Sequence, residues 1–311
     1  MSNRAMQRSL LGAALIFVLA LPQLVYPILA LDILLWGLFA LALNLLLGYG
    51  GLLSFGHAAF WGSAAYAAGI AAKQWGLPFP LAALSGMVVA VLLALPIGYL
   101  SIRRTGIYFS MVTLAFAQMI FYIVNQWRGV TGGENGLQGI PRTLWGLNLS
   151  DPTIFYYAVL PLVLLGFWLT FRVVHSPFGH VLVAIRDNEA RARALGYPTD
   201  RYKLIVFLIS AGLSGLAGGL FALGHGFTAL EVVHWTTSGT VVMMTILGGI
   251  GTLWGGIVGA ALVLLLRDWL SNWTDAWGVI TGAIFVLVVL SFRRGIWGTL
   301  LQRTAGREQR S

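Results

Sequence analysis

The chain has 311 residues, of which 58% are hydrophobic and only 9% are Asp, Glu, Lys or Arg. Soluble domains carry about 25% charged residues, so this composition excludes an ordinary soluble protein. The net charge is +9, which is typical of membrane proteins with basic cytoplasmic loops rather than of nucleic-acid binding, and the absence of cysteine excludes disulfides and thiolate sites.

Long apolar runs predict an all-α polytopic membrane protein, because a span needs roughly 20 mostly apolar residues. Taken in chain order, the candidate spans are Leu10–Ala30, Ile33–Leu47, Leu52–Ala72, Leu81–Leu100, Ile107–Asn125, Ile154–Phe171, Leu204–Leu223, Thr237–Ile250, Leu253–Leu266 and Ala276–Phe292. The eighth and ninth are short and predict either two spans or one re-entrant hairpin. We therefore expect about ten transmembrane helices, or eight plus a hairpin, in a single domain over residues 1–311.

The basic residues predict how the chain is oriented. With the N-terminus in the cytoplasm and alternating spans, 15 of the 19 Lys and Arg residues fall inside and 4 fall outside. The positive-inside rule therefore places both termini in the cytoplasm. The segment 126–153 becomes an outer loop, and 186–203 lies on the cytoplasmic side.

Two similar octapeptides indicate a possible internal repeat. "GGLLSFGH" (Gly50–His57) and "GGLFALGH" (Gly218–His225) are identical at five of eight positions. An inverted-topology repeat, common in transporters, is one explanation. Chance is the other, because glycine and leucine are abundant in this chain.

The sequence holds no pattern that favours catalysis or a metal site. No Gly-Lys pair exists, so the P-loop that binds ATP phosphates is missing. Ser54 and His57 are three residues apart, but a nucleophile needs a base within reach and a metal needs more clustered ligands. Gly251, Gly255 and Gly259 recur every four residues, which predicts a helix face for close packing.

Milder polar residues lie within the apolar runs and are candidates for a translocation path. Such residues also form hydrogen bonds between helices, so both interpretations stay open. Carboxylates occur only in loops or near span ends, which argues against a proton-coupled carrier. The candidates are Asn44, Ser54, His57, Tyr66, Thr113 and Gln118.

The most charged stretch is "RDNEARARALGYPTDRYK", Arg186–Lys203, and it predicts a short capped helix. Asp187 or Asn188 can cap its start. Glu189 and Arg193 are four residues apart and can pair along the helix. Gly196 suits the C-terminal cap, and a proline follows two residues later.

This stretch and the span after it, "AIRDNEARARALGYPTDRYKLIVFLISAGLSGLAGGL", resemble branched-chain amino acid ABC transporter permeases of the LivM type. Three further blocks agree in family order. They are "GYGGLLSFGHAAFWGSAAYAAG", "RTGIYFSMVTLAFAQMI" with "TGGENGLQGIP", and "TILGGIGTLWGGIVGA". The general importer motif has Glu-Ala-Ala with glycine six residues after the Glu, whereas here Glu189-Ala190 precedes Arg191 and Gly196 comes seven after.

The resemblance implies a permease subunit in the bacterial inner membrane, with no cofactor on this chain. It implies a second permease of the LivH type, two ATPases of the LivG and LivF type that bind ATP and Mg²⁺, and an extracytoplasmic binding protein. The ATPase-coupling residues it implies are Arg186, Asp187, Glu189, Ala190, Arg193, Ala194, Leu195 and Gly196. The residues it implies for docking of the binding protein are Glu134, Asn135 and Glu231.

Two other classes of function remain as alternatives. One is a secondary carrier driven by an ion gradient, and the other is a membrane-embedded enzyme. The cargo is also open among branched-chain amino acids, other amino acids, amides and urea.

Overall fold

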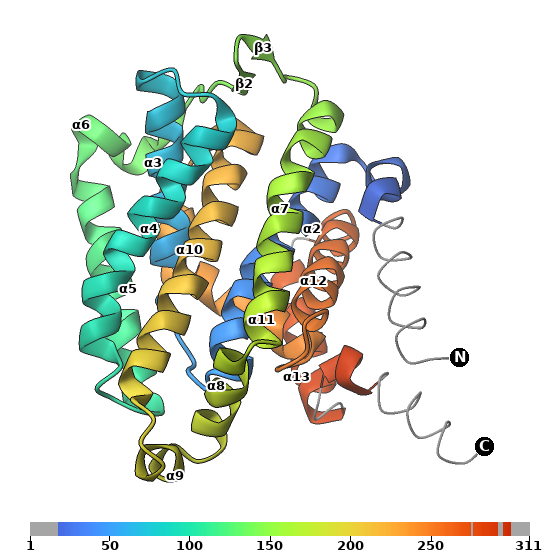
Figure 1. Cartoon of the computed structure of the whole chain (residues 1–311). Coiled ribbons are helices and arrows are strands. Elements are labelled where there is room, and N and C mark those ends of the chain that lie inside the picture. The colour runs from blue at the N-terminus through green and yellow to red at the C-terminus, as the bar shows by residue number, and fades with distance from the viewer. Residues whose placement is uncertain (1–17, 275, 292–294, 300–311) are drawn as a thin grey trace.

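The computed structural model describes residues 18–274, 276–291 and 295–299, and its long helices lie side by side as a bundle (Figure 1). The longer helices are α2 Pro27–Asn44, α3 His57–Gln74, α4 Phe79–Ser101, α5 Ile107–Gln126, α7 Pro152–Val174, α8 Pro177–Asp187, α10 Thr199–His225, α11 Trp235–Gly248, α12 Gly255–Ser271 and α13 Trp277–Ser291. The shorter ones are the π-helix η1 Leu45–Tyr49, α6 Arg128–Thr131, η2 Gly133–Asn135, α9 Glu189–Ala194 and η3 Leu230–Val233.

Six of the described helical runs are long and apolar enough to cross a membrane. They are α2 with η1, α4, α5, α7, α10 and the run that begins with α13. The all-α polytopic class is therefore confirmed. Part of the first predicted span lies outside the described residues, so the count of ten stays a prediction.

The helix boundaries revise four of the predicted spans. The helix is interrupted at Val25–Tyr26, so Ala30 belongs to α2 rather than to the first predicted span. The third predicted span, Leu52–Ala72, begins five residues too early, because the segment before His57 is not helical. Thr237–Ile250 and Leu253–Leu266 become α11 and α12. α11 has 14 residues, about 21 Å at 1.5 Å per residue and shorter than the roughly 30 Å hydrocarbon core.

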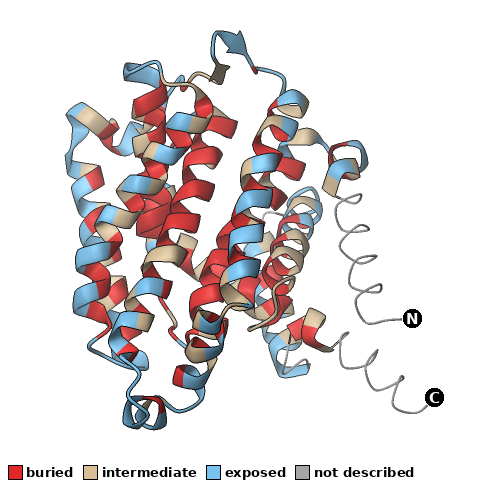
Figure 2. Ribbon diagram, in the orientation of Figure 1, coloured by how far each residue is buried: buried red, intermediate tan, exposed pale blue. Residues whose placement is uncertain are grey.

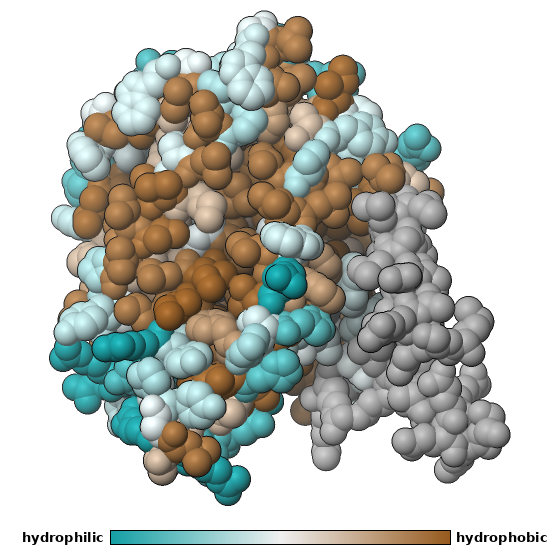
Figure 3. All heavy atoms as spheres, in the orientation of Figure 1, coloured by the Kyte–Doolittle hydropathy of each residue, from teal (hydrophilic) through white to brown (hydrophobic). Residues whose placement is uncertain are grey.

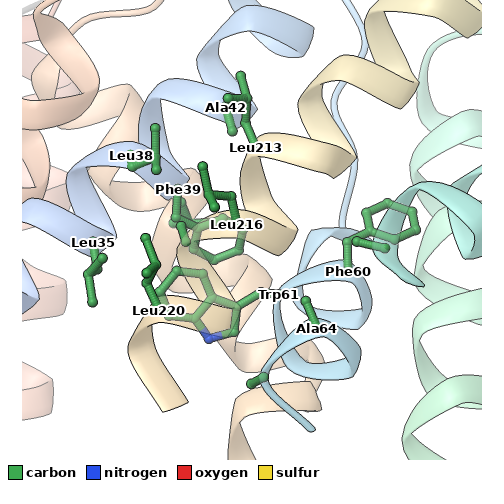
Figure 4. Close-up of a cluster of buried hydrophobic side chains, with 14 of the residues drawn as sticks. Leu35, Leu38, Phe39, Ala42, Phe60, Trp61, Ala64, Leu213, Leu216 and Leu220 are labelled. Carbon is green, nitrogen blue, oxygen red and sulfur yellow. The ribbon is translucent and has the colours of Figure 1, made fainter. Parts of the chain in front are cut away.

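The core lies where α2, α3 and α10 meet (Figures 2 and 4). Trp61 of α3 is fully buried, and its ring stacks on Phe39 of α2 with centroids 4.5 Å apart. Gly218 of α10 lies against the backbone of α3, and a Cβ there would collide with the carbonyl oxygen of Trp61. Aromatic bulk on α2 and α3 thus faces small residues on α10, which lets the helices approach closely.

Short strands close one end of the bundle, which we call the β end. β1 Leu137–Gln138 pairs antiparallel with β4 Phe227–Thr228, and β2 Thr143–Leu144 pairs antiparallel with β3 Leu147–Asn148. The opposite end, which we call the α9 end, carries α8, α9 and the turn between α4 and α5 (Figure 1).

Basic residues are sorted between these two ends as the sequence predicts. Figure 3 shows hydrophilic side chains gathered at the α9 end below an apolar band. The described basic residues at the α9 end are Arg103, Arg104, Arg172, Arg186, Arg191, Arg193, Arg201 and Lys203. Those at the other end are Lys73, Arg128, Arg142 and Arg267.

The two similar octapeptides do not form equivalent structures. Gly218–His225 lies wholly inside α10, whereas Gly50–His57 runs from the end of η1 through a non-helical segment to the first residue of α3. Their likeness therefore gives no support to the predicted inverted repeat.

Candidate functional site

A non-helical segment, residues 50–56, separates η1 from α3, and we call this segment the break. Apart from the exposed Gly51, the break is buried or half-buried, and Ser54 within it is fully buried. In a membrane protein, non-helical backbone persists only where protein or water satisfies its polar groups. The polar backbone groups of the break therefore need hydrogen-bond partners from other parts of the chain.

Hydroxyl groups from two helices, α5 and α11, bond to the break and to the first turn of α3 that follows it. The Ser110 hydroxyl of α5 donates to the Leu53 carbonyl oxygen (2.6 Å). Thr113, also on α5, accepts from the Phe55 backbone N–H (3.3 Å). The Ser238 hydroxyl of α11 accepts from the Ala58 N–H (2.7 Å), in the first turn of α3. These side chains pair with backbone groups of the break and of the first turn of α3, which fixes the conformation of this part of the chain.

His57 adds a buried polar contact at the start of α3. Its Nε2 lies 2.8 Å from the Ser210 hydroxyl of α10. Ser210 in turn donates to the Ala42 carbonyl oxygen of α2 (2.5 Å). The Ser210 proton is thus engaged, so Nε2 of His57 is the donor in their bond. The described residues offer no partner to Nδ1 of His57.

Asn44, at the end of α2, holds the loop between α11 and α12. Its Oδ1 accepts from the Gly251 N–H (2.9 Å), and its Nδ2 donates to the Thr252 carbonyl oxygen (2.6 Å). Gly251 lies in this loop with φ +76°, outside α12. The predicted packing face of three glycines is therefore wrong for Gly251. At Gly255 and Gly259 a Cβ would collide with the backbone of the α11 segment, which explains those two glycines.

The six candidate path residues are not gathered into one lining. Asn44, Ser54, His57 and Thr113 are buried and bonded within the chain. Tyr66 is buried, and its hydroxyl has no partner among the described residues. Gln118 is exposed on α5. Hydrogen bonds within the chain thus account for the four bonded residues, while a path role remains a prediction. Ser110, Ser210 and Ser238 were missed, because single serines in apolar runs give no pattern.

The predicted capped helix at 186–203 is present as α9. Asn188 is its N-cap, and its side chain accepts from the Arg191 N–H (2.9 Å). At the other end the Gly196 N–H donates to the Arg193 carbonyl (3.0 Å), and the Tyr197 N–H donates to the Ala192 carbonyl (3.2 Å). These two bonds form a Schellman cap, and Gly196 supplies the positive φ of +89° that it requires.

Glu189 links α9 to α10 rather than facing freely outward. Its carboxylate pairs with the buried ammonium of Lys203 (2.6 Å) and, as predicted from the spacing, with Arg193 (3.1 Å). Asp187 pairs instead with its neighbour Arg186 (2.8 Å). The ion pairs of Glu189 therefore fix the orientation of α9.

A surface groove of about 710 Å³ lies between α9 and the turn that joins α4 to α5. Its walls carry both charges, and Leu195, next to Gly196, is 72% exposed. The residues that line the groove are Ile102, Arg103, Thr105, Glu189, Ala190, Arg193 and Asp200. Charged side chains thus line most of the groove, and an exposed leucine lies at the end of α9.

At the β end, the fold brings the predicted docking residues toward one another. Glu134 and Asn135 lie in η2, and Glu231 lies in η3. The antiparallel pairing of β1 with β4 joins the segments that carry them. All three residues are exposed, so the fold presents them on one end of the molecule.

Comparisons with known proteins cover most of the chain. A sequence model of the family described as "branched-chain amino acid transport system / permease component" matches residues 27–289. The high-affinity branched-chain amino acid transport permease proteins LivM of Salmonella typhimurium and Escherichia coli are each 31% identical, over 82% of this chain and 66% of theirs. The chain thus spans about two thirds of the length of these curated relatives.

A more distant relative is named for the import of a different molecule. The autoinducer 2 import permease LsrC of Klebsiella pneumoniae is 34% identical, over 43% of this chain and 41% of its own. No solved structure matches the chain.

Proposed function

Because the chain belongs to the family of permease components of branched-chain amino acid transport systems, we propose that it is the membrane-spanning subunit of an ATP-driven importer. The relatives and the six apolar helical runs make it a multi-pass protein of the bacterial inner membrane. The proposed cargo is a branched-chain or related amino acid, since the two LivM relatives are named for that transport.

The energy source in this proposal is a pair of separate ATPase subunits. This chain contains no Gly-Lys pair and hence no P-loop, which supports ATP hydrolysis elsewhere. ATP and Mg²⁺ would bind to those subunits.

The observation that carries the proposal, beside the family match, is α9 with its groove. α9 is capped at both ends and held by the ion pairs of Glu189, so it can transmit force as a rigid unit. Its exposed residues include Ala190, Ala194 and Leu195. In our proposal an ATPase subunit binds this surface, which makes the α9 end cytoplasmic in accord with its basic residues.

The β end would then face the outside and meet a solute-binding protein. Glu134, Asn135 and Glu231 are exposed there and offer acceptor groups to that partner. A second permease of the LivH type would complete the membrane unit.

Reconstitution into proteoliposomes tests the function. We expect no leucine uptake by this chain alone, and uptake when the second permease, the ATPases, the binding protein and ATP are added. Uptake by the chain alone along an ion gradient would instead establish a secondary carrier. Turnover of a substrate without transport would establish an enzyme.

A further inference from the structure

The contacts of Arg186 point to a role inside the chain rather than at a partner. Arg186 lies in the last turn of α8, two residues before Asn188, which joins α8 to α9. Its Nη1 donates to the carbonyl oxygen of Gly48 in η1 (2.6 Å), 138 residues earlier in the sequence. This bond connects the α8–α9 segment directly to the π-helix that leads into the break.

Asp187 aims this guanidinium. Its Oδ1 accepts from both Nε (3.0 Å) and Nη2 (2.8 Å) of Arg186, which leaves Nη1 directed at Gly48. The planar fork of arginine makes all three bonds at once, and a lysine ammonium does not have that geometry. The chain therefore uses a property specific to arginine at this position.

Glycines make the close approach possible. Gly51 has φ +69°, and a Cβ there would lie 2.7 Å from the Cγ of Arg186. A Cβ on Gly48 would collide with the backbone N of Gly251 and with the side chain of Asn44. Arg186, η1 and the loop between α11 and α12 thus meet at one place, which we call the junction.

The junction leads to the buried polar groups through a few residues of backbone. The break follows η1 directly and bonds to α5, and the first two residues of α3, which come next, bond to α10 through His57 and to α11 through Ala58. Asn44 ties the same place to the loop of α11 and α12. A displacement of α8 would therefore pull on the segment that contacts all of these helices.

We propose that Arg186 is a positioning residue that couples movement of the α8–α9 segment to the break between α2 and α3. This inference rests on the proposed function, since it needs an ATPase that moves α9. It assigns Arg186 a task different from the direct ATPase contact that the family resemblance implies. Leu195 and the groove residues would hold the ATPase, while Arg186 would pass the movement inward.

The test compares three variants of the complete transporter in proteoliposomes: Arg186→Ala, Leu195→Asp and, as a matched control, Arg172→Ala at the exposed end of α7. Two quantities are measured, the ATPase retained on purification and the ATP hydrolysed per substrate taken up. We expect Arg186→Ala to retain the ATPases and to raise the ATP used per substrate about tenfold or more, as for loss of a charge-assisted hydrogen bond. Leu195→Asp should lose the ATPases, and Arg172→Ala should behave as the wild type.

Two further variants guard against a folding defect. Arg186→Lys keeps the charge without the fork and should be intermediate. Asp187→Asn removes the charge that aims the fork and should raise the same ratio without removing the arginine. The inference is overturned if Arg186→Lys and Asp187→Asn hydrolyse as much ATP per substrate as the wild type. It is also overturned if Arg186→Ala loses the ATPases as Leu195→Asp does. A wild-type complex that transports no amino acid would instead overturn the proposed function.

Discussion

At the scale of single residues, one ion pair changes the meaning of an expected contact residue. Glu189 is expected from the family resemblance to touch an ATPase, but its carboxylate bonds to Lys203, whose side chain is only 4% exposed. An ammonium left in that position without a partner is costly, because burial penalises an uncompensated charge. Substitutions of Glu189 would thus act on the protein itself before they act on a partner.

We predict that Glu189→Arg lowers the free energy of unfolding by about 3 kcal/mol, near the lower end for breaking a buried pair, because the Glu189 side chain is 29% exposed. Thermal unfolding of the purified protein in detergent measures the effect. Glu189→Gln should also lower the free energy of unfolding, because it leaves the buried Lys203 ammonium unpaired. Adding Lys203→Met to Glu189→Gln removes that ammonium and should restore most of the lost stability. If the double variant is less stable than either single variant, the pair does not carry the stability of α9.

Some individual residues were predictable from sequence and others were not. Asn188 and Gly196 were identified because caps depend on residue type and near neighbours. Asn44 was assigned to a possible path, and nothing local shows that its partners are Gly251 and Thr252, about 207 residues away. Hydrogen bonds over such distances depend on how the helices pack, and single residues do not reveal that.

At the scale of elements, apolar length predicted most of the helices well. Ile107–Asn125 was predicted and α5 is Ile107–Gln126, because glycine and charges bound a single apolar run. α3 was misplaced at its start, since a buried extended segment is as apolar as a helix. The break became visible only in the structure, where hydroxyls of α5 bond to its backbone.

The contact of α3 with α10 gives the prediction at this scale. Gly218→Ala places a Cβ against the Trp61 carbonyl and should cost about 2 kcal/mol by overpacking. Gly239→Ala in α11 is the matched control, because a Cβ there meets nothing within 4 Å. The control should be neutral or slightly stabilising, since alanine favours helix. Equal unfolding temperatures for both variants would contradict the packing argument.

At the scale of the whole molecule, the basic residues divide between the two ends as the positive-inside rule predicts. The division follows from chain order alone, because each span reverses the direction. Which end faces the cytoplasm stays a prediction, made from the greater number of arginines at the α9 end.

The lack of cysteine makes this orientation easy to measure. Leu195→Cys and Trp145→Cys place single thiols at sites that are 72% and 77% exposed, at opposite ends of the bundle. A maleimide that does not cross membranes should label Trp145→Cys from the periplasmic side, and Leu195→Cys only in inverted vesicles. Labelling of both from one side would contradict the fold, and the reverse pattern would contradict the orientation.

The contact between Trp61 and Gly218 also has a consequence for how the chain is made. α3 has 18 residues but is not among the six runs apolar enough to span a membrane unaided. Its closest packing surface on α10 is synthesised only after the intervening residues 75–198 have left the ribosome. Until α10 is made, α3 lacks this packing partner, so we expect α3 to reach its final position in the bilayer only after α10 has been inserted.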